Sequence, residues 1–281
     1  MVNWSSLLET PEYIIQENDC ITNWFDDIAS VLLNGYSLIV NYCTYRILEV
    51  EFYYFASNHS DIFAHQNPLQ KSCGYWYFHR QGEKSYKNGS FKGLDITFGN
   101  YASYGGILIR SLESVEGKLI IGPSLCVDAL LAQTNTDSIG ELDKALVGLK
   151  VSDGSSIIRL EETSEVRNDQ IFCSARIGLS LKKLQFISEK QQYILRPYRY
   201  LVQPRKVSKG KLHLVLALYI HGKSLEYIHS VTGSPQRTIS KYIQDFEAGK
   251  QEVDFSRYVG INLNSQELSR LHGTCFNHQI I

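Results

Sequence analysis

The spacing of apolar residues changes along the chain from helical to strand-like and then back to helical. Residues 1–40 carry apolar side chains at helical spacing in SSLLETPEYIIQ and ITNWFDDIASVLLNG, and Gly35 is placed to end the second of these helices. Strands are expected from Tyr36 to Ile121, in SLIVNYCTYRILEVEFYYF, GYWYFHR, GLDITFG and GGILIRSLES, which are rich in aromatic and β-branched residues. A short helix over GPSLCVDALLAQ, capped by Ser124, and strands in SSIIRLEE and IFCSARIGLS are expected next.

A polar segment, RPYRYLVQPRKVSKG, separates this region from the last part of the chain. It contains two prolines, several basic residues and a glycine, so a domain boundary is expected between residues 204 and 205. Helices are predicted beyond it over KLHLVLALYIHG, KSLEYIHSVTG and SPQRTISKYIQDFEAG. The second of them would end at Thr232 and Gly233, and Ser234 would cap the third, with Pro235 in its first position.

This order of helices is typical of a helix-turn-helix, whose last helix enters the major groove of DNA. The outward face of that helix would carry Gln236, Arg237, Ser240, Lys241 and Gln244. Its inward face would carry Ile239, Tyr242, Ile243 and Phe246. Arg and Gln side chains suit contacts with base edges and phosphates, although a three-helix packing module without nucleic acid would have the same pattern.

The stretch RILEVEFYYF, residues 46–55, places two carboxylates inside an otherwise apolar strand. Side chains of a strand alternate between its two faces, which puts Glu49, Glu51 and Tyr53 on one face and Leu48, Val50, Phe52 and Tyr54 on the other. The apolar face is expected to be core. The polar face is expected to point either to solvent, as in most half-buried strands, or into a pocket.

Composition narrows the class of protein. The chain has 281 residues, 43% hydrophobic and 20% charged, with a net charge of -1, as in an ordinary globular protein of one or two domains. The charge is uneven, because residues 205–281 hold ten Lys or Arg against six Asp or Glu, a net of +4 that leaves -5 on the rest. A modestly basic tail domain is compatible with binding to nucleic acid.

Cysteine spacing and hydropathy exclude several classes of protein. Six cysteines are scattered without CxxC spacing, which predicts free thiols and does not support a zinc or redox site. The first residues lack a basic segment followed by an apolar run, so no signal peptide is expected, and LHLVLALYI, which contains His213, is too short to span a bilayer. We therefore expect a soluble cytoplasmic protein without a membrane contact, metal or cofactor, and no protein partner is predicted.

Several segments, in order between Tyr45 and Leu201, together resemble the alkyladenine (3-methyladenine) DNA glycosylase family. They are RILEVEFYYF followed by His65, GGILIRSLESVEG, GPSLCVDALL, IFCSARIGLS and LRPYRYL. The resemblance implies an α+β fold with a curved, mostly antiparallel sheet or partial barrel and flanking helices. With the small all-α helix-turn-helix domain, this predicts a catalytic domain over residues 1–204, helical over 1–40, and a DNA-binding domain over 205–281.

The same resemblance assigns chemistry to individual residues. Glu51 falls on the family's catalytic glutamate, a general base that activates water to attack C1′ of the deoxyribose, and Arg110 falls on the arginine beside it. Tyr53 and His65 fall on the aromatic walls that hold a base flipped out of double-stranded DNA. No lysine falls at a catalytic position, so an abasic site without a Schiff base is the expected product. If these residues have only structural roles, Arg110 is expected to form an ion pair with Glu49, His65 to be a loop residue, and Tyr53 to lie on the strand surface.

Two departures from the family bear on the substrate. Tyr77 and His79 of YWYFHR stand where the family has a different aromatic hairpin, and Asp95 of GLDITFG stands where it has an asparagine beside the flipped purine. A carboxylate only accepts hydrogen bonds, which suits an exocyclic amine or sugar hydroxyls, unless Asp95 simply caps a turn beside Gly93. These changes favour a bulky hypermodified base, such as glucosylated hydroxymethylcytosine of phage DNA, excised in antiviral defence.

Other functions remain open at the level of sequence. An enzyme of this family could instead excise alkylated purines in base-excision repair. A chain of this composition could also be a non-catalytic reader of modified DNA, or a transcription regulator whose large N-terminal domain senses a ligand.

Overall fold

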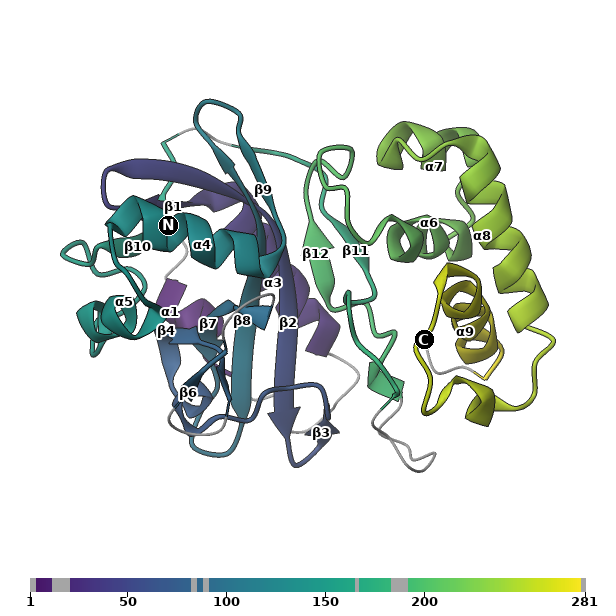
Figure 1. Cartoon of the computed structure of the whole chain (residues 1–281), viewed down its shortest axis with the longest axis horizontal. Coiled ribbons are helices and arrows are strands. Elements are labelled where there is room, and N and C mark those ends of the chain that lie inside the picture. The colour runs from purple at the N-terminus through teal and green to yellow at the C-terminus, as the bar shows by residue number, and fades with distance from the viewer. Residues whose placement is uncertain are drawn as a thin grey trace. The chain divides into compact units, whose positions relative to one another are not determined.

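The computed structural model describes residues 4–11, 21–81, 85–87, 91–164, 167–182 and 192–278. The chain forms two compact units (Figure 1). The first unit comprises Met1–Ile171 and Tyr200–Val202, and the second comprises Phe172–Arg199 and Gln203–Ile281.

The first unit is α+β and is built on a large, open, mostly antiparallel sheet, as the fold class predicts (Figure 1). Six strands of this sheet run in the order β10, β1, β2, β8, β7, β4. Their bounds are β1 Tyr36–Val40, β2 Cys43–Ala56, β4 Cys73–Phe78, β7 Leu94–Phe98, β8 Tyr104–Ser114 and β10 Ile158–Glu162. β3 (His59–Ser60) and β12 (Arg199–Leu201) pair with β2, β9 (Leu119–Ile121) pairs with β8, and β5 (Arg80–Gln81) pairs separately with β6 (Ser85–Tyr86).

Helix α3 (Ile21–Gly35) covers one face of this sheet with its apolar side. Phe25 stacks on Phe52 of β2 with ring centroids 4.6 Å apart, and Trp24 meets Tyr54 at 5.7 Å. The apolar face of the RILEVEFYYF strand is therefore core, as predicted, with Leu48, Val50, Phe52 and Tyr54 all buried.

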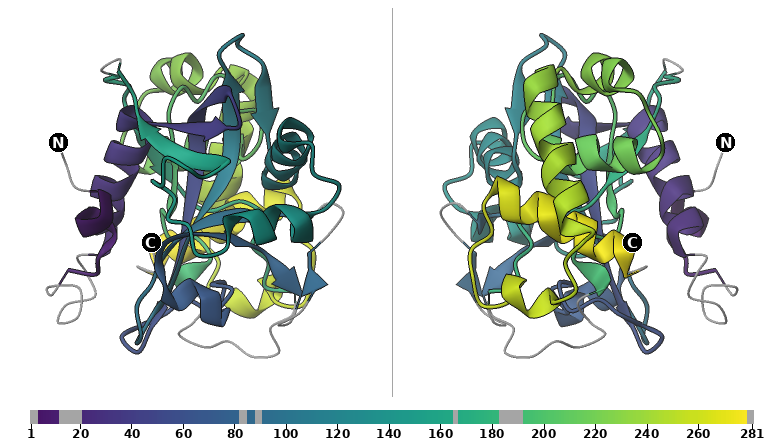
Figure 2. Two further views of the ribbon diagram at one scale, coloured as in Figure 1. Left: turned by 90° about the vertical axis from the view of Figure 1, so that its left-hand side faces the viewer. Right: turned by 90° about the vertical axis from the view of Figure 1, so that its right-hand side faces the viewer.

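Further helices of the first unit are α1 (Trp4–Leu8), η2 (Pro68–Lys71), α4 (Pro123–Thr134) and α5 (Ile139–Leu146). α4 lies on the side of the sheet opposite α3 (Figure 2). Two expected bounds are corrected. The helical part ends at Gly35 and not near residue 40, because β1 begins at Tyr36. α4 begins after Gly122 without a side-chain cap, since the Ser124 hydroxyl donates to the Lys92 carbonyl at 3.3 Å. The helical pattern expected over residues 12–16 lies outside the described residues.

The second unit holds β11 (Phe172–Ser174) and the helices α6 (Lys211–Ile220), α7 (Leu225–Thr232), α8 (Gln236–Gly249), η5 (Phe255–Tyr258) and α9 (Ser265–Asn277). Leu212, Leu216 and Phe246 form a buried core cluster in this unit. α8 and α9 cross closely (Figure 2). A Cβ on Gly273 would lie 2.0 Å from the Phe246 carbonyl oxygen, so this approach requires glycine.

A tight turn joins α7 to α8. Gly233 ends α7 in the left-handed region at φ 68°, as the sequence predicts. α8 starts one residue later than expected, because Pro235 has an extended backbone and is the N-cap, and Gln236 is the first helical residue. Ser234 is buried in the turn, where its carbonyl accepts a hydrogen bond from His229 Nδ1 at 2.8 Å.

The segment Phe172–Arg199 belongs to the second unit, although the composition of the chain placed it before the domain boundary. Arg199 is buried and donates to Ser174 Oγ at 3.0 Å and to the carbonyls of Lys209 and Gly210 at 3.2 and 3.4 Å. These hydrogen bonds tie the segment to residues beyond 203. Composition does not indicate such a connection, because it depends on where one buried arginine points.

Bilayer crossing would require a longer and more apolar helix than any that the described residues form.

Candidate active site

Glu49 and Glu51 lie on the polar face of β2 and are both buried. Glu49 is 1% exposed and Glu51 is 0% exposed, so the expectation of an ordinary solvent-facing strand is wrong. Arg110 on β8 contacts both: its Nη1 donates to Glu51 Oε2 at 3.1 Å, and its Nε donates to Glu49 Oε1 at 3.4 Å. Tyr53 donates its hydroxyl to Glu51 Oε2 at 2.8 Å, and the Ser111 hydroxyl donates to Glu49. The polar face of β2 is therefore an interior cluster of hydrogen-bonded charges.

An irregularity in the pairing of β2 with β8 lets two neighbouring residues of β8 reach this cluster. Ile47 pairs with Leu112 and Val50 pairs with Ile109, so the register is the same before and after this point, but Glu49 between them pairs with Ser111 instead of Arg110. In a regular strand Arg110 and Ser111 would point to opposite faces. The local irregularity at Glu49 brings Ser111 to the side that Arg110 already occupies, so both contact carboxylates.

Arg110 brings a permanent positive charge into the cluster. Burial alone would lower its pKa, but the nearby carboxylates of Glu51 and Glu49 raise the pKa above its usual value. A carboxylate that acts as a general base must be ionised to take a proton from water, and an adjacent guanidinium is the neighbour that such a base needs.

Glu51, Asp95 and Tyr77 lie in one row across the sheet. Glu51 pairs with Leu108 on β8, Leu108 pairs with Asp95 on β7, and Asp95 pairs with Tyr77 on β4. Residues that are directly paired point to the same face of a sheet. Neighbouring strands lie about 4.8 Å apart, which puts Glu51 and Asp95 roughly 9–10 Å from each other along this row.

Asp95 is held at both carboxylate oxygens. Its Oδ1 lies 2.8 Å from His79 Nε2, and its Oδ2 accepts a hydrogen bond from Gln70 Nε2 at 2.9 Å. Gly106 makes room for this arrangement, since a Cβ there would lie 2.5 Å from both Asp95 Oδ2 and Gln70 Nε2. Asp95 therefore does not cap a turn beside Gly93, and instead anchors two side chains in the interior of the site.

Gln70 was not expected at the site from the sequence. It is the last-but-one residue of η2, where Asn67 is the N-cap and the Asn67 N–H donates to Gln70 Oε1 at 3.3 Å. The sequence Asn-Pro-Leu-Gln is a capping box with proline in the first turn, a signal that could have indicated this short helix. It does not indicate that the amide of Gln70 reaches Asp95.

Three rings form the far end of the row. The ring centroids of His65 and His79 are 5.2 Å apart, those of His65 and Tyr77 are 5.7 Å apart, and those of Tyr77 and His79 are 5.9 Å apart. The Tyr77 hydroxyl lies 2.7 Å from His65 Nδ1, so His65 is not an isolated loop residue. Trp76 points to the opposite face, as alternation predicts, and donates to the Ile158 carbonyl at 2.9 Å.

Burial controls the protonation of two of these rings. It lowers the pKa of His65 to about 4, with the charges of His79 and Lys87 acting in the same direction. Burial also raises the pKa of Tyr77, and the charge of Asp95 adds to this effect. At neutral pH the Tyr77 hydroxyl therefore keeps its proton, and it shares a hydrogen bond with Nδ1 of a neutral His65.

The residues expected to contact DNA lie in the second unit, and all are exposed on α8. They are Gln236, Arg237, Ser240, Lys241 and Gln244. On the inward side of α8, Ile239 and Phe246 are buried and Tyr242 and Ile243 are half-buried. The two faces of this helix therefore follow from helical spacing alone.

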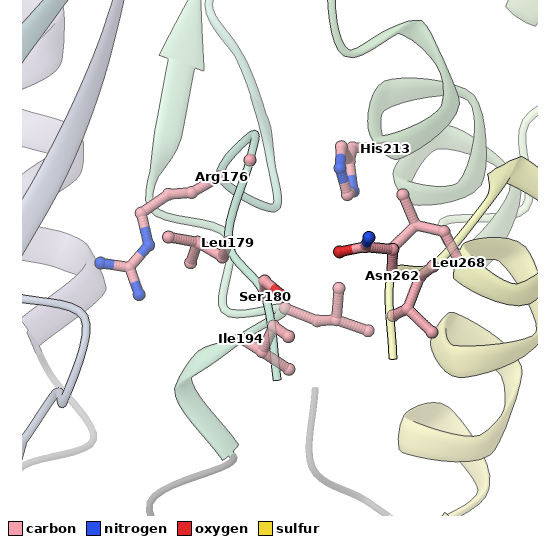
Figure 3. Close-up of a pocket in the computed structure, with 10 residues that line it drawn as sticks. Arg176, Leu179, Ser180, Ile194, His213, Asn262 and Leu268 are labelled. Atoms are coloured by element: carbon pink, nitrogen blue, oxygen red, sulfur yellow. The ribbon is translucent and has the colours of Figure 1, made fainter. Parts of the chain in front are cut away.

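A separate cavity of about 210 Å³ lies within the second unit (Figure 3). His213 and Asn262 lie near each other on one side of it, whereas the guanidinium of Arg176 points away from them. His213 Nδ1 is 2.9 Å from His272 Nε2 of α9. The described lining contains none of the residues that the sequence assigned to catalysis or base binding.

No group of three or more His, Cys, Asp and Glu side chains suitable for holding a metal ion occurs among the residues that the structure describes. Cys43, Cys73, Cys126, Cys173 and Cys275 form no disulfide among the described residues, and Cys20 lies outside them.

No protein-family model matches the chain. It is 33% identical over 211 residues to the "Uncharacterized protein L759" of Acanthamoeba polyphaga mimivirus, an alignment that covers 70% of this chain and 94% of the viral protein. The chain belongs to the family of that viral protein. The name of this relative states no activity.

Proposed function

We propose that the first unit is a monofunctional DNA glycosylase, which flips a modified base out of double-stranded DNA and hydrolyses its N-glycosidic bond. The row from Glu51 through Leu108 and Asp95 to Tyr77 is the observation that supports this most directly. Hydrolysis of a glycosidic bond needs a carboxylate that activates water and, some distance away, a place for the leaving group. The row provides a buried carboxylate beside a guanidinium at one end and a group of rings at the other.

In this mechanism Glu51 takes a proton from a water molecule whose oxygen attacks C1′ of the deoxyribose. The electron pair of the C1′–N bond leaves with the base, and positive charge develops on the sugar in the transition state. The carboxylate of Glu51 stabilises this charge electrostatically. Arg110 and Tyr53 hold the Oε2 atom of Glu51 through hydrogen bonds of 3.1 and 2.8 Å, which keeps the carboxylate in one orientation. The product is an abasic site.

The rings of His65, Tyr77 and His79, with Tyr53 three strands away on β2, would hold the flipped base. An enzyme that acts on the C1′–N bond has to take the base out of the stack, and stacking on aromatic side chains offsets part of the free energy lost in unstacking. Tyr53, His65 and His79 are half-buried, as expected for the wall of a site that opens to a ligand.

We further propose that the second unit is a helix-turn-helix that holds the DNA. Its α7, the turn at Gly233 and α8 have the order and lengths of that motif, and Arg237 and Lys241 are exposed on α8. This unit would supply affinity for the duplex, largely through phosphates, while the first unit carries out the chemistry.

For the substrate we favour a bulky hypermodified base, such as glucosylated hydroxymethylcytosine of phage DNA, in antiviral defence. The pair of Asp95 and His79 offers hydrogen-bonding groups beside the rings, whereas a cage for a cationic alkylated purine needs only aromatic faces. Excision of alkylated purines in repair is the alternative substrate class for the same site.

A non-catalytic reader of modified DNA, or a transcription regulator, is the second candidate function. The exposed basic face of α8 favours DNA binding under either interpretation. A reader does not require a buried carboxylate beside an arginine, and a regulator would bind a defined operator without producing abasic sites.

Substitution of the general base separates these functions. Glu51→Gln keeps the size of the side chain but cannot take a proton from water, so we expect base release to fall by at least about 10²–10⁴-fold. Glu161→Gln, which changes an exposed glutamate of β10, is the matched control and should release base at the wild-type rate. For each of the three proteins, mass spectrometry measures the bases released from glucosylated phage DNA, alkylated DNA and unmodified DNA.

Two results would contradict the glycosylase. Wild-type protein that binds these DNAs and releases no base from any of them is a reader or regulator. Equal release of base by the wild-type protein and by Glu51→Gln would show that Glu51 is not the general base.

A further inference from the structure

His79 is held through one of its two ring nitrogens. Its Nε2 lies 2.8 Å from Asp95 Oδ1, and the other oxygen of Asp95 is fixed by Gln70. The ring also lies directly over Gly93, where a Cβ would come within 2.8 Å of Nδ1. Asp95, Gln70 and Gly93 therefore set the orientation of the imidazole and leave Nδ1 as its second proton-carrying atom.

The His65 imidazole, next to His79, is not suited to donate a proton. Burial keeps the pKa of His65 at about 4, and its Nδ1 is taken up by a hydrogen bond with the Tyr77 hydroxyl at 2.7 Å. Two imidazolium rings with centroids 5.2 Å apart would repel each other. Of the two rings, His79 is the one whose Nε2 lies against a carboxylate, 2.8 Å from Asp95 Oδ1.

The residue that holds this imidazole lies in the same cross-sheet row as Glu51. Asp95 lies two strands from Glu51 in the cross-sheet row, roughly 9–10 Å away, and His79 is bonded to it. In glycosidases that activate a water directly, the acid and the base lie on opposite sides of the glycosidic bond, with water and the sugar carbon between them. The same order of groups would place the leaving base next to His79.

We propose that His79 is the general acid of the proposed glycosylase, with Asp95 as the residue that positions it, and that the leaving base is therefore a neutral one. This inference rests on the proposed function and adds the class of substrate. A base that already carries a positive charge leaves without a proton, whereas a neutral base leaves as an unstable anion unless a proton reaches it.

The step balances in atoms and charge. Water loses a proton to the Glu51 carboxylate, and its oxygen forms the new bond to C1′. The C1′–N bond breaks, its electron pair goes to the base, and the Nδ1–H of the His79 imidazolium transfers its proton to a ring nitrogen or carbonyl oxygen of the base. Glu51 then returns its proton to solvent and His79 takes one from solvent.

The charge of the acid also selects against the alternative substrate. A cationic alkylated purine would meet the like charge of an imidazolium in a half-buried site, which disfavours its binding. The site therefore fits the neutral hypermodified base better than a 7-methylated purine.

The test compares two leaving groups under single-turnover conditions, with DNA containing glucosylated hydroxymethylcytosine and DNA containing 7-methylguanine. We expect His79→Gln to lower release of the neutral base by about 10²–10⁴-fold more than release of the cationic base, since only the former needs a proton. Asp95→Asn should also lower release of the neutral base more than release of the cationic base, by a smaller factor than His79→Gln. His221→Gln, which changes an exposed histidine of the second unit, is the matched control.

The outcomes distinguish this inference from the proposed function. Release of 7-methylguanine alone by wild-type protein, or an equal loss on both DNAs in His79→Gln, overturns the acid role of His79 and leaves the glycosylase in place. Failure of wild-type protein to release any base overturns the proposed function itself.

Discussion

At the scale of single residues, the two carboxylates of β2 differ in their surroundings. Glu49 receives the Ser111 hydroxyl and the Nε of Arg110, whereas Glu51 receives the Tyr53 hydroxyl and the Nη1 of Arg110. Glu51 is also the one that lies in the row leading to Asp95. The proposed division of roles, with Glu51 as the base and Glu49 as a partner of Arg110, follows from these contacts.

Gly106 provides a test of how tightly the site is packed. In Gly106→Ala the new Cβ would lie 2.5 Å from Asp95 Oδ2 and from Gln70 Nε2. These buried side chains are hydrogen-bonded to each other, so neither can move aside independently. We expect the free energy of unfolding to fall by about 1–3 kcal/mol and base release to fall with it. Urea unfolding and base release measure the two effects.

Gly154→Ala is the matched control for this substitution, because no atom lies within 4 Å of its Cβ position. A Gly106→Ala protein as stable and as active as Gly154→Ala would mean that the pair of Asp95 and Gln70 is not packed as described.

At the scale of elements, the site depends on strands that are adjacent in space and distant in sequence. β2, β8, β7 and β4 are neighbours in the sheet, so residues 51, 108, 95 and 77 fall into one row although the chain visits them in a different order. In the second unit, α6 and α9 are joined by a buried pair of histidines, His213 and His272.

This pair makes the packing of α6 and α9 sensitive to acid. Burial lowers the pKa of His272 to about 3, below the value of about 6.5 that an unfolded histidine has. The unfolded chain therefore binds more protons below pH 6.5, so the stability of the second unit is complete above that pH. It declines as the pH falls toward 3, by at most about 1.4 kcal/mol per pH unit.

Hydrogen exchange of the α6 and α9 amides at pH 7.5 and pH 5, corrected for the intrinsic effect of pH, measures this decline. His272→Gln should reduce the difference between the two pH values, while the exposed His221→Gln should leave it as in the wild type. Protection in α6 and α9 that does not depend on pH in the wild type would show that the pair of histidines does not titrate on unfolding.

At the scale of the whole molecule, the chain separates its proposed tasks between two units. The sheet of the first unit carries Glu51, Asp95 and the rings, and α8 of the second unit carries the exposed polar face. The net charge of -1 hides this division, since the second unit holds 16 Lys or Arg against seven Asp or Glu, a net of +9 that leaves -10 on the first unit. A basic unit attached to an acidic one is consistent with a chain that binds DNA in one part and acts on it in another.

Salt dependence of DNA binding tests the task of the second unit. Removing two phosphate contacts in the double variant Arg237→Ala and Lys241→Ala should lower the slope of log K against log salt by about 1.8. Lys118→Ala, which removes an exposed charge from the first unit, is the control and should change the slope little. Fluorescence anisotropy with an unmodified duplex at several salt concentrations gives the slopes, and identical slopes for all three proteins would count against α8 as the DNA-binding element.

The sequence by itself determined what depends on local spacing. The apolar face of β2, the end of α3 at Gly35, the turn at Gly233 and the exposed face of α8 follow from alternation, helical period and the backbone freedom of glycine. Each involves only residues within a few positions of each other.

Only the tertiary structure decided what depends on register and burial. The complete burial of Glu51, the irregular pairing of Glu49 with Ser111, and the contact of Gln70 with Asp95 all depend on segments distant in sequence. So do the hydrogen bonds of Arg199 that assign Phe172–Arg199 to the second unit. A one-residue shift in strand pairing would turn these side chains to the other face, and no local pattern encodes which pairing the folded chain adopts.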